Sequence, residues 1–216
     1  MSSPHRPRVL LADDHLLVAE ALKSLLTPEF ELVGVVEDGR ALVEAAGRLR
    51  PDVIVADITM PRLNGIDALI QLRQGGDQVP VVFLTMHRDV TFARRALEAG
   101  ASGFVLKHSA SVELISAIRA ALLGKTYLTP QLAGEVLEAM KQAPDRAADP
   151  IASITPRQRE VLQLLAEGRS AKEIASSLSI SARTVEFHKY QLMETLGLHT
   201  NAELIHFAIK HGLVEL

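Results

Sequence analysis

Five side chains in the first half of the chain are suited to phosphoryl chemistry, because together they supply acids, a hydroxyl and an amine. They are Asp13, Asp14, Asp57, Thr85 and Lys107. If the fold gathers them, three carboxylates repel one another, and Mg²⁺, which prefers carboxylate and carbonyl oxygens, would relieve that repulsion. A carboxylate beside Mg²⁺ can act as the nucleophile toward a phosphoryl donor. The metal and a lysine ammonium would then stabilise the charge on the transferred group.

Each of these residues follows a short apolar segment with the composition of a buried strand. The segments are rich in Val, Ile and Leu and alternate little with polar residues, which is typical of strands covered on both faces. They are Val9–Ala12, Leu32–Val36, Val53–Ala56, Val79–Leu84 and Gly103–Leu106. Amphipathic stretches separate them, so residues 8–125 predict an α/β doubly wound (βα)5 domain with a parallel five-stranded sheet. Ligands bind at the carboxyl ends of such strands, so the five side chains are expected on one rim.

Taken singly, each of the five residues has an ordinary structural explanation. Asp13 or Asp14 could cap a helix, and Asp57 could be a loop carboxylate. Thr85 could be a strand-end hydroxyl and Lys107 a solvated surface lysine. Their coincidence at the ends of successive strands favours a shared site over five independent explanations.

The pattern changes after Gly124, and no strand-like run occurs beyond Thr155. A helix is expected over residues 129–142, and the polar, proline-containing segment 143–150 is interpreted as a linker. Four helices then follow, whose expected N-caps are Thr155, Ser170, Ser181 and Asn201. We therefore divide the chain into a first domain at 1–126, a linker helix and linker at 127–150, and an all-α four-helix helix–turn–helix domain at 151–216.

The third of these helices, residues 182–196, has an unusual outer face. Its core face on a helical wheel consists of Val185, Leu192 and Leu196. Phe187 and Tyr190 fall on the opposite side, next to Arg183. Two outward aromatics beside a cation suit a contact surface, although two stray exposed aromatics are the alternative interpretation.

Composition limits the possible classes of function. There is no Cys, which excludes disulfides, thiolate nucleophiles and Cys-based metal sites. The formal net charge of −3 excludes a uniformly basic nucleic-acid coat, and residues 151–216 carry seven basic and seven acidic side chains. No apolar stretch approaches the roughly 18 residues of a membrane span. The eight histidines show no spacing that favours a metal site. The chain is expected to be cytoplasmic.

The first domain resembles the receiver domain of two-component response regulators. The motifs are Leu11-Ala12-Asp13-Asp14-His15, Asp57-Ile58-Thr59-Met60-Pro61, Asn64-Gly65, Thr85 and Gly103-Phe104-Val105-Leu106-Lys107. The resemblance implies that Asp57 is the phosphoacceptor and that Asp13 and Asp14 hold Mg²⁺ together with it. It also implies that Thr59 supplies its backbone carbonyl to the metal.

The same resemblance implies a switch around the phosphoryl group. Thr85 would move its hydroxyl onto a phosphoryl oxygen, Lys107 would pair with that group, and Phe104 would swing inward behind Thr85. The chain departs from the common pattern in three places. Phe104 stands where Tyr is commoner, His108 where many receivers have Pro, and Met86 where a small residue is usual.

Residues 152–214 resemble the LuxR-type helix–turn–helix, and the pairing with a receiver is typical of the NarL/FixJ branch of response regulators. The motifs are Thr155-Pro156-Arg157-Gln158, Gly168-Arg169-Ser170-Ala171-Lys172-Glu173-Ile174-Ala175, Arg183-Thr184-Val185-Glu186-Phe187-His188 and Leu196-Gly197. The resemblance makes residues 182–196 the recognition helix. The base-contacting positions would be Glu186, Phe187 and Tyr190. The candidates for phosphate contacts are Lys172, Arg183, Thr184 and Lys189.

The leading hypothesis is a transcription regulator rather than an enzyme. A partner histidine kinase would phosphorylate Asp57, and the protein would then form a homodimer that binds double-stranded DNA at paired half-sites. Because residues 151–216 are neutral, one output domain alone is expected to bind weakly. A phosphohydrolase would need a general acid two residues after Asp57, where Thr59 stands. A regulator that works without phosphorylation is the third hypothesis, which the complete acidic set disfavours.

Overall fold

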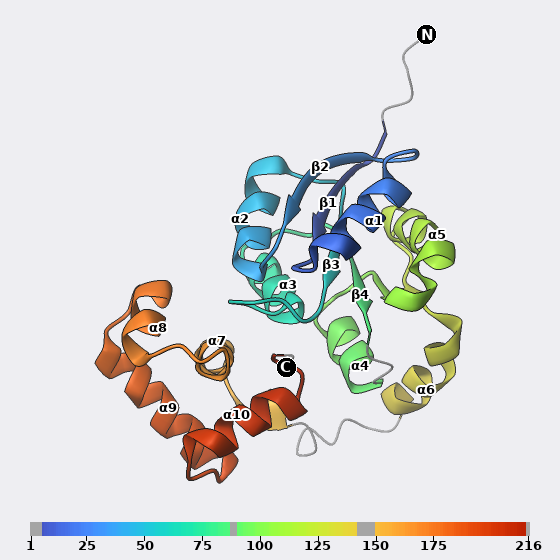
Figure 1. The fold of residues 1–216 in the computed structure, drawn as a ribbon. Coiled ribbons are helices and arrows are strands. Elements are labelled where there is room, and N and C mark those ends of the chain that lie inside the picture. Colours follow the sequence, from blue (N-terminus) through green and yellow to red (C-terminus); the bar gives the residue numbers. More distant parts are fainter. Residues whose placement is uncertain (1–5, 87–89, 142–149, 215–216) are drawn as a thin grey trace. The chain divides into compact units, whose positions relative to one another are not determined.

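The computed structural model of the chain describes residues 6–86, 90–141 and 150–214. These residues divide into two compact units, of which the first comprises residues 6–60 and 64–141 and the second residues 61–63 and 150–214. Figure 1 shows an α/β unit built on a central sheet and a second unit built only from helices. The α/β and all-α fold classes expected from the sequence are confirmed.

The first unit is built on a parallel sheet whose strand order is β2-β1-β3-β4-β5-β6. The strands are β1 (Arg8–Ala12), β2 (Glu31–Val36), β3 (Val53–Asp57), β4 (Val81–Thr85), β5 (Gly103–Leu106) and β6 (Tyr127–Leu128). The sheet has six strands rather than the expected five. The sixth was missed because it is only two residues long and lies in what we interpreted as the start of the linker. It forms because the chain returns alongside β5, where Gly103 pairs with Tyr127.

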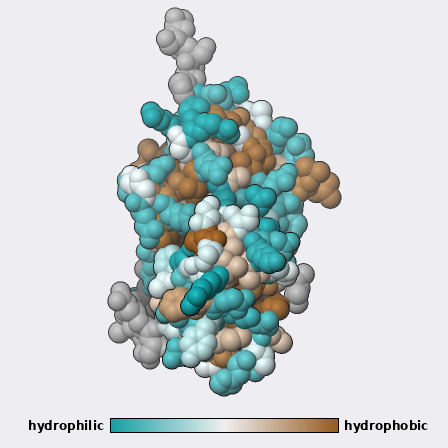
Figure 2. All heavy atoms as spheres, turned by 90° about the vertical axis from the view of Figure 1, so that its left-hand side faces the viewer, coloured by the Kyte–Doolittle hydropathy of each residue, from teal (hydrophilic) through white to brown (hydrophobic). Residues whose placement is uncertain are grey.

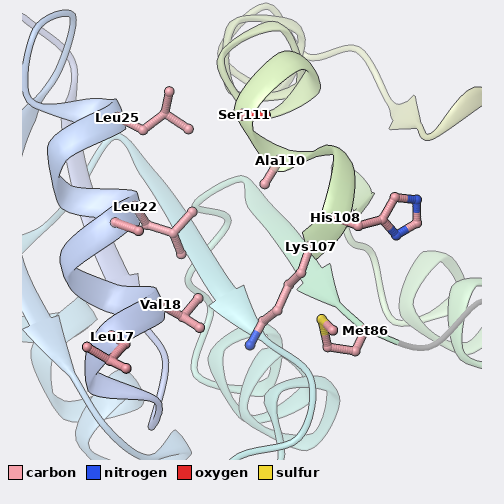
Figure 3. Close-up of a pocket in the computed structure, with 10 residues that line it drawn as sticks. Leu17, Val18, Leu22, Leu25, Met86, Lys107, His108, Ala110 and Ser111 are labelled. Atoms are coloured by element: carbon pink, nitrogen blue, oxygen red, sulfur yellow. The ribbon is translucent and has the colours of Figure 1, made fainter.

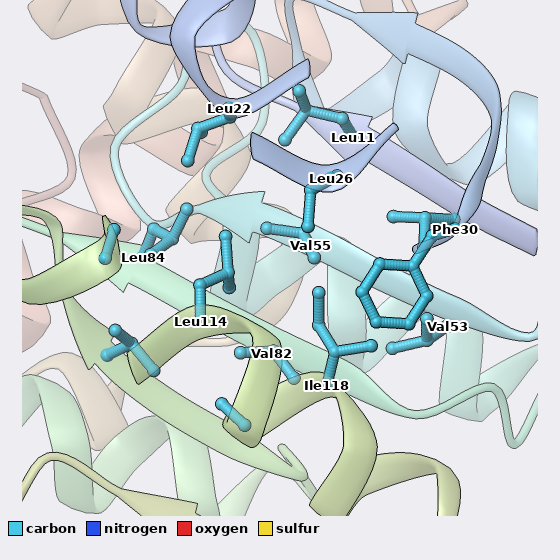
Figure 4. Close-up of a cluster of buried hydrophobic side chains, with 14 of the residues drawn as sticks. Leu11, Leu22, Leu26, Phe30, Val53, Val55, Val82, Leu84, Leu114 and Ile118 are labelled. Atoms are coloured by element: carbon cyan, nitrogen blue, oxygen red, sulfur yellow. The ribbon is translucent and has the colours of Figure 1, made fainter. Parts of the chain in front are cut away.

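Helices connect the strands and cover the sheet. They are α1 (Leu16–Leu26), α2 (Gly39–Leu49), α3 (Gly65–Gln74), α4 (Val90–Glu98), η1 (Lys107–Ser109), α5 (Ala110–Leu122) and α6 (Pro130–Lys141). Figure 4 shows the apolar cluster where α1 and α5 meet the sheet: Leu22 and Leu26 approach Val55, and Leu114 and Ile118 lie beside Val82. The strand residues of this cluster are fully buried, which is why the strands lack the polar alternation of one-sided sheets.

The second unit is a four-helix domain with an aliphatic core. Its elements are η2 (Pro150–Ser153), α7 (Pro156–Ala166), α8 (Ala171–Leu178), α9 (Ala182–Leu196) and α10 (Asn201–Lys210). Val161, Leu162, Ile174, Val185 and Leu192 are buried together in its core. The core face expected for residues 182–196 is therefore correct for Val185 and Leu192, which are fully buried, while Leu196 is only partly buried.

Local capping explains where these helices begin. Thr155 and Ser170 each accept a bond from the backbone N–H three residues on, and Gln158 and Glu173 bond back, so both helices begin with a capping box. Ser181 caps α9 through Thr184 N–H. The fourth expected cap was wrong by one residue. Thr200, not Asn201, caps α10, because its hydroxyl accepts from Glu203 N–H and the Glu203 carboxylate bonds back.

The segment between the units is only partly described. The expected helix at 129–142 is present as α6, and most of the expected linker, residues 143–149, lies outside the described residues. Within the part of the chain that the structure covers, no helix is both long and apolar enough to cross a membrane. The face drawn in Figure 2 is mostly hydrophilic, with apolar side chains scattered among polar ones, as is usual for protein surfaces.

Candidate functional site

The carboxyl ends of β1, β3, β4 and β5 bring the expected side chains to one edge of the sheet. Asp57 and Thr85 are the last residues of β3 and β4. Asp13 directly follows β1, and Lys107 directly follows β5. Parallel pairing in register sets Asp57 beside Leu84, one residue before Thr85. The shared rim expected from the order of the strands is therefore present.

A buried ion-pair network forms the centre of this rim. The Lys107 Nζ atom lies 2.6 Å from Oδ2 of Asp57 and 2.9 Å from Oδ2 of Asp13. The three side chains are only 8%, 7% and 1% exposed, respectively. The other oxygen of Asp57, Oδ1, accepts the Ile58 N–H at 2.7 Å. One ammonium thus bridges two carboxylates that would otherwise repel each other in a low-dielectric site.

Burial and neighbouring charges shift the pKa values of Asp57 and Lys107 through different balances of effects. Burial raises the pKa of Asp57 to about 6, against the opposing effects of Lys107 and of the Ile58 N–H, while the Asp13 charge raises it further. For Lys107, burial acts to lower the pKa, but the Asp57 and Asp13 carboxylates outweigh it, so the net pKa is raised. Lys107 therefore stays charged at neutral pH, and Asp57 is ionised but less stable in that form than an exposed carboxylate.

Four residues of the rim could hold a metal ion. They are Asp13, Asp14, His15 and Asp57, each of which offers one ligand atom within 4.8 Å of the others. Asp14 and His15 are exposed, whereas Asp13 and Asp57 are buried. The Nδ1 atom of His15 lies 3.0 Å from Oδ1 of Asp14 and 3.4 Å from Oδ1 of Asp13. Three carboxylates form an oxygen-rich donor set, which is the set a hard divalent cation prefers.

His15 is a member of this cluster that the sequence reasoning missed. It is the N-cap of α1, with an extended backbone, and its own N–H donates to Oδ1 of Asp13 at 2.9 Å. That bond turns the chain tightly enough to bring the imidazole beside both acids. Its position directly after Asp14 was the available signal. His15 has no second histidine at helical spacing, so the spacing of the histidines alone does not indicate it.

Gly65, which the sequence motif Asn64-Gly65 already singled out, brings its backbone close to Asp57. A Cβ atom at position 65 would lie 2.2 Å from the backbone oxygen of Asp57, so any side chain would displace the strand end. The Gly65 N–H also donates to Ile58 O at 2.7 Å. Asn64 precedes it as the N-cap of α3 and accepts the Asp67 N–H. The Asn64-Gly65 pair therefore fixes the loop that follows Asp57.

The remaining expected residues of the first unit are all buried. Thr85 is 1% exposed, and Phe104 is fully buried with its backbone in register with Phe83. Thr59, two residues after Asp57, is also buried. Their roles toward a phosphoryl group or a metal stay predictions.

An open apolar pocket of about 640 Å³ borders the same rim. Figure 3 shows Leu17, Val18, Leu22 and Leu25 on α1, with Ala110 and Ser111 of α5 across from them. Met86, Lys107 and His108 also line it, and through Lys107 the pocket adjoins the ion-pair network. Leu17 is 86% exposed, which is unusual for a leucine on a helix that packs against a core.

In the second unit, α9 presents the expected outer face. Phe187 and Tyr190 are 56% and 66% exposed, and Arg183 and Glu186 are exposed beside them. The carboxylate of Glu186 lies 3.7 Å from Nζ of Lys189, one turn along the helix. This face thus combines two aromatic rings with one acidic and two basic groups.

The two other candidates for nucleic-acid contact, Lys172 and Thr184, differ in solvent exposure and in existing hydrogen bonds. Lys172, in the first turn of α8, is exposed. Thr184 is partly buried, and its Oγ1 lies 2.8 Å from Oγ of Ser181, so its hydroxyl already takes part in the start of α9.

A parallel sheet with an acidic rim at its carboxyl end, joined to a helix–turn–helix unit, defines a regulator with a receiver. Residues 9–119 match the response regulator receiver domain, and residues 152–208 match the bacterial regulatory proteins of the luxR family. The chain belongs to the two-component response regulators that carry a LuxR-type output domain. The resemblance seen in the sequence is confirmed.

The relatives and solved structures named below match this chain along nearly its whole length. The chain is 36% identical to the transcriptional regulatory protein MctR of Rhizobium johnstonii, over 99% of this chain and 98% of the relative. Among solved structures, RcsB of Salmonella typhimurium is 26% identical with a TM-score of 0.65, covering 96% of this chain and 98% of that one. A structure described as an RcsB–DNA complex is 27% identical with a TM-score of 0.58, covering 96% and 99%.

Proposed function

We propose that Asp57 is the phosphoacceptor of this regulator and that its phosphorylation controls DNA binding by the second unit. The observation that carries the proposal is the buried contact of Asp57 with Lys107 at 2.6 Å. A buried carboxylate with a raised pKa is destabilised as an anion, which is typical of a group held for chemistry rather than for stability.

The transfer step uses the groups that surround Asp57. One carboxylate oxygen attacks the phosphorus of a phosphohistidine on the kinase, a P–O bond forms, and the P–N bond breaks with its electron pair going to the imidazole nitrogen. Lys107 neutralises charge on the transferred group, and the Thr85 hydroxyl would move to bond a phosphoryl oxygen. Phe104 would follow into the space that Thr85 leaves.

Magnesium fits the chemistry of the donor set, since Asp13, Asp14 and Asp57 offer carboxylate oxygens close together. These three residues and the backbone carbonyl of Thr59 are the proposed ligands. When bound, Mg²⁺ supplies charge neutralisation for the phosphoryl oxygens. Asp13 then has two roles, which are to hold the cation and to keep Lys107 oriented, whereas Asp14 would act as a ligand alone.

The apolar pocket beside the rim is the proposed contact of the kinase. Any protein donor must bring its phosphohistidine to Asp57, so part of its surface must cover the adjoining pocket. Leu17, Val18 and Leu25 on α1 have the spacing of one helix face and suit an apolar helical partner. Among the residues that line the pocket, the polar side chains are those of Lys107, His108 and Ser111.

The output function is proposed for α9. Glu186, Phe187 and Tyr190 would contact bases, and Lys172, Arg183, Thr184 and Lys189 would contact phosphates. Glu186 can accept from a cytosine amino group, and an aromatic ring can cover a thymine methyl group. A neutral domain gains little from phosphate contacts, so two copies on paired half-sites are needed. Phosphorylation would favour that homodimer.

The chain would act in the cytoplasm without catalytic turnover. The proposed boundaries are a receiver at 1–126, a linker helix and linker at 127–150, and an output domain at 151–216. A phosphohydrolase is disfavoured because the side chain two residues after Asp57 is the buried Thr59, which is not an acid.

The test is phosphorylation by a small donor. The full chain is incubated with phosphoramidate and Mg²⁺, and intact mass spectrometry detects an acid-labile phosphoryl group. Asp57→Asn and Asp57→Ala should abolish it. Asp52→Asn, directly before the first residue of β3, is the matched control and should leave it intact. A native protein without a phosphoryl group, or steady release of inorganic phosphate at enzymic rates, would overturn the proposal.

A further inference from the structure

The polar side chain of Thr129 is fully buried at the edge of the sheet where the sixth strand ends. It lies directly after β6 and directly before α6, at the point where the sequence predicted the start of the linker helix. Polar groups that are buried this completely normally have a defined set of hydrogen-bond partners. The partners of Thr129 connect the phosphorylation site with the helix that leads to the output domain.

Thr129 fastens the end of β5 through both its backbone and its side chain. Its N–H donates to Phe104 O at 3.0 Å. Its Oγ1 accepts the Leu106 N–H at 3.2 Å and donates to Oε2 of Glu113 at 2.8 Å. The hydroxyl thereby extends the ladder of hydrogen bonds by one step beyond the end of β6. The residue that it holds, Leu106, directly precedes Lys107.

The same row of the sheet contains the proposed switch threonine. Thr85 at the end of β4 is in register with Leu106 on β5, and Thr129 bonds Leu106 from the other side. Leu106 therefore lies between two threonines on adjacent segments. If Thr85 or Lys107 moves toward a phosphoryl group, the backbone of Leu106 must move with it. The hydrogen bond from the Leu106 N–H to Thr129 then carries that movement to Thr129.

Thr129 also begins the helix that leaves the receiver. The Leu132 and Ala133 N–H groups donate to Thr129 O at 2.9 and 3.2 Å. From there α6 packs on α4, with Leu132 and Val136 buried. One residue thus belongs both to the strand end that carries Lys107 and to the first turn of the linker helix. Glu113 on α5 holds it in place, and Tyr127 donates to the same carboxylate oxygen at 3.2 Å.

We propose that Thr129 is a positioning residue, which holds the Leu106–Lys107 backbone through its hydroxyl and transmits the displacement of that backbone to α6. Glu113 fixes the direction of the hydroxyl, because it accepts the hydroxyl proton and leaves a lone pair for the Leu106 N–H. The proposal rests on the proposed function, since it assumes that Lys107 responds to a phosphoryl group on Asp57. It assigns the route out of the receiver to the β5–β6 edge of the sheet.

The test compares two substitutions at one position in the full chain. Thr129→Val keeps the shape of the side chain and removes the hydroxyl, whereas Thr129→Ser keeps the hydroxyl. Each protein is phosphorylated with phosphoramidate and Mg²⁺, and hydrogen exchange of the α6 amides (residues 130–141) is measured with and without the phosphoryl group. Tyr127→Phe is the control, because it removes a different hydroxyl from Glu113 and leaves the Leu106 bond in place.

The expected result is that phosphorylation of Asp57 no longer changes hydrogen exchange in α6 to the native extent. Thr129→Val should still be phosphorylated on Asp57, but the response of α6 exchange should shrink by about 2- to 30-fold, which is the range for residues on a coupling route. Thr129→Ser and Tyr127→Phe should respond like the native chain. If Thr129→Val does not fold, Glu113→Gln replaces it, with the same loss expected, because an amide can donate toward the hydroxyl and reverse its direction.

A full response of α6 in phosphorylated Thr129→Val would overturn the proposal, and so would an equal loss in Thr129→Ser. Failure of the proposed function gives a different result. In that case the native chain itself takes up no phosphoryl group, and both proposals are overturned together.

Discussion

Replacing Asp57 by Asn should stabilise the metal-free protein, although it removes one partner of a buried ion pair. The reason is that burial, the largest influence on Asp57, raises its pKa from 3.8 to about 6 despite the nearby Lys107. A group with a raised folded pKa binds its proton more tightly in the folded state. Its ionisation above pH 6 therefore costs about 3 kcal/mol of stability, at about 1.4 kcal/mol per tenfold difference in proton affinity.

The sign of the pH dependence follows directly. Stability falls as the pH rises from the unfolded value of 3.8 to the folded value of about 6, and it is then constant. An uncharged Asn at position 57 does not have this loss. The gain from Asp57→Asn should thus be about 1–3 kcal/mol at pH 7.5, about half of that at pH 5 and close to zero near pH 4.

The measurement is urea unfolding of the full chain in EDTA, followed by circular dichroism, with hydrogen exchange of β1 and β3 amides to assign the transition to the receiver. Glu20→Gln on the exposed face of α1 is the control and should change stability by less than about 0.5 kcal/mol. Mg²⁺ should narrow the difference, because a ligand at tenfold over its Kd stabilises the native protein by about 1.4 kcal/mol. A metal-free Asp57→Asn protein less stable than the native one at pH 7.5 would refute the reasoning, because the contact with Lys107 would then outweigh the cost of burial.

Three further outcomes are expected. Thr200→Ala should lower the free energy of unfolding of the output domain by about 1 kcal/mol, while Asn201→Ala should cost under about 0.5 kcal/mol, because only Thr200 caps α10; equal effects in urea unfolding would contradict this. Leu17→Glu should leave phosphorylation by phosphoramidate unchanged and slow transfer from a sensor kinase by about tenfold, since a contact of about 1.4 kcal/mol is lost; equal transfer rates would remove the pocket from the kinase contact. Phe187→Ala should weaken binding to DNA selected from a random pool by about 1–3 kcal/mol in fluorescence anisotropy, and Glu186→Gln should relax the preference at one base pair; unchanged affinity and preference would exclude α9 from base reading.

Much of the fold could be predicted because its signals are local. The run Val53–Ala56 is apolar throughout, and in the sheet it is buried on both faces. Ser170 with Glu173 three residues later is a capping box that depends only on adjacent turns of the chain. The one wrong cap arose because Thr200 and Asn201 are both good capping residues, and local preference cannot separate neighbours. In the folded protein Thr200 has the extended backbone of an N-cap, and its hydroxyl accepts the Glu203 N–H.

Contacts between distant segments were harder to predict. β6 has two residues and no periodicity of its own, and it exists because α5 returns the chain to the edge of β5. The participation of His15 depends on how its N–H meets the Asp13 carboxylate. Thr129 was expected only to begin the linker helix, and nothing in its local sequence shows that its hydroxyl accepts the Leu106 N–H.

The sequence by itself determined which chemistry was available at the rim. Acids, a hydroxyl and an amine at successive strand ends meet in any right-handed parallel sheet, because the crossovers bring the carboxyl ends to one edge. Only the tertiary structure decided how those groups act on each other. Lys107 and Asp57 are 50 residues apart, yet their side chains meet at 2.6 Å in a largely buried site. The raised pKa of Asp57 follows from that burial, since the loss of water around an anion depends on the packing of the whole domain and not on its neighbours in sequence.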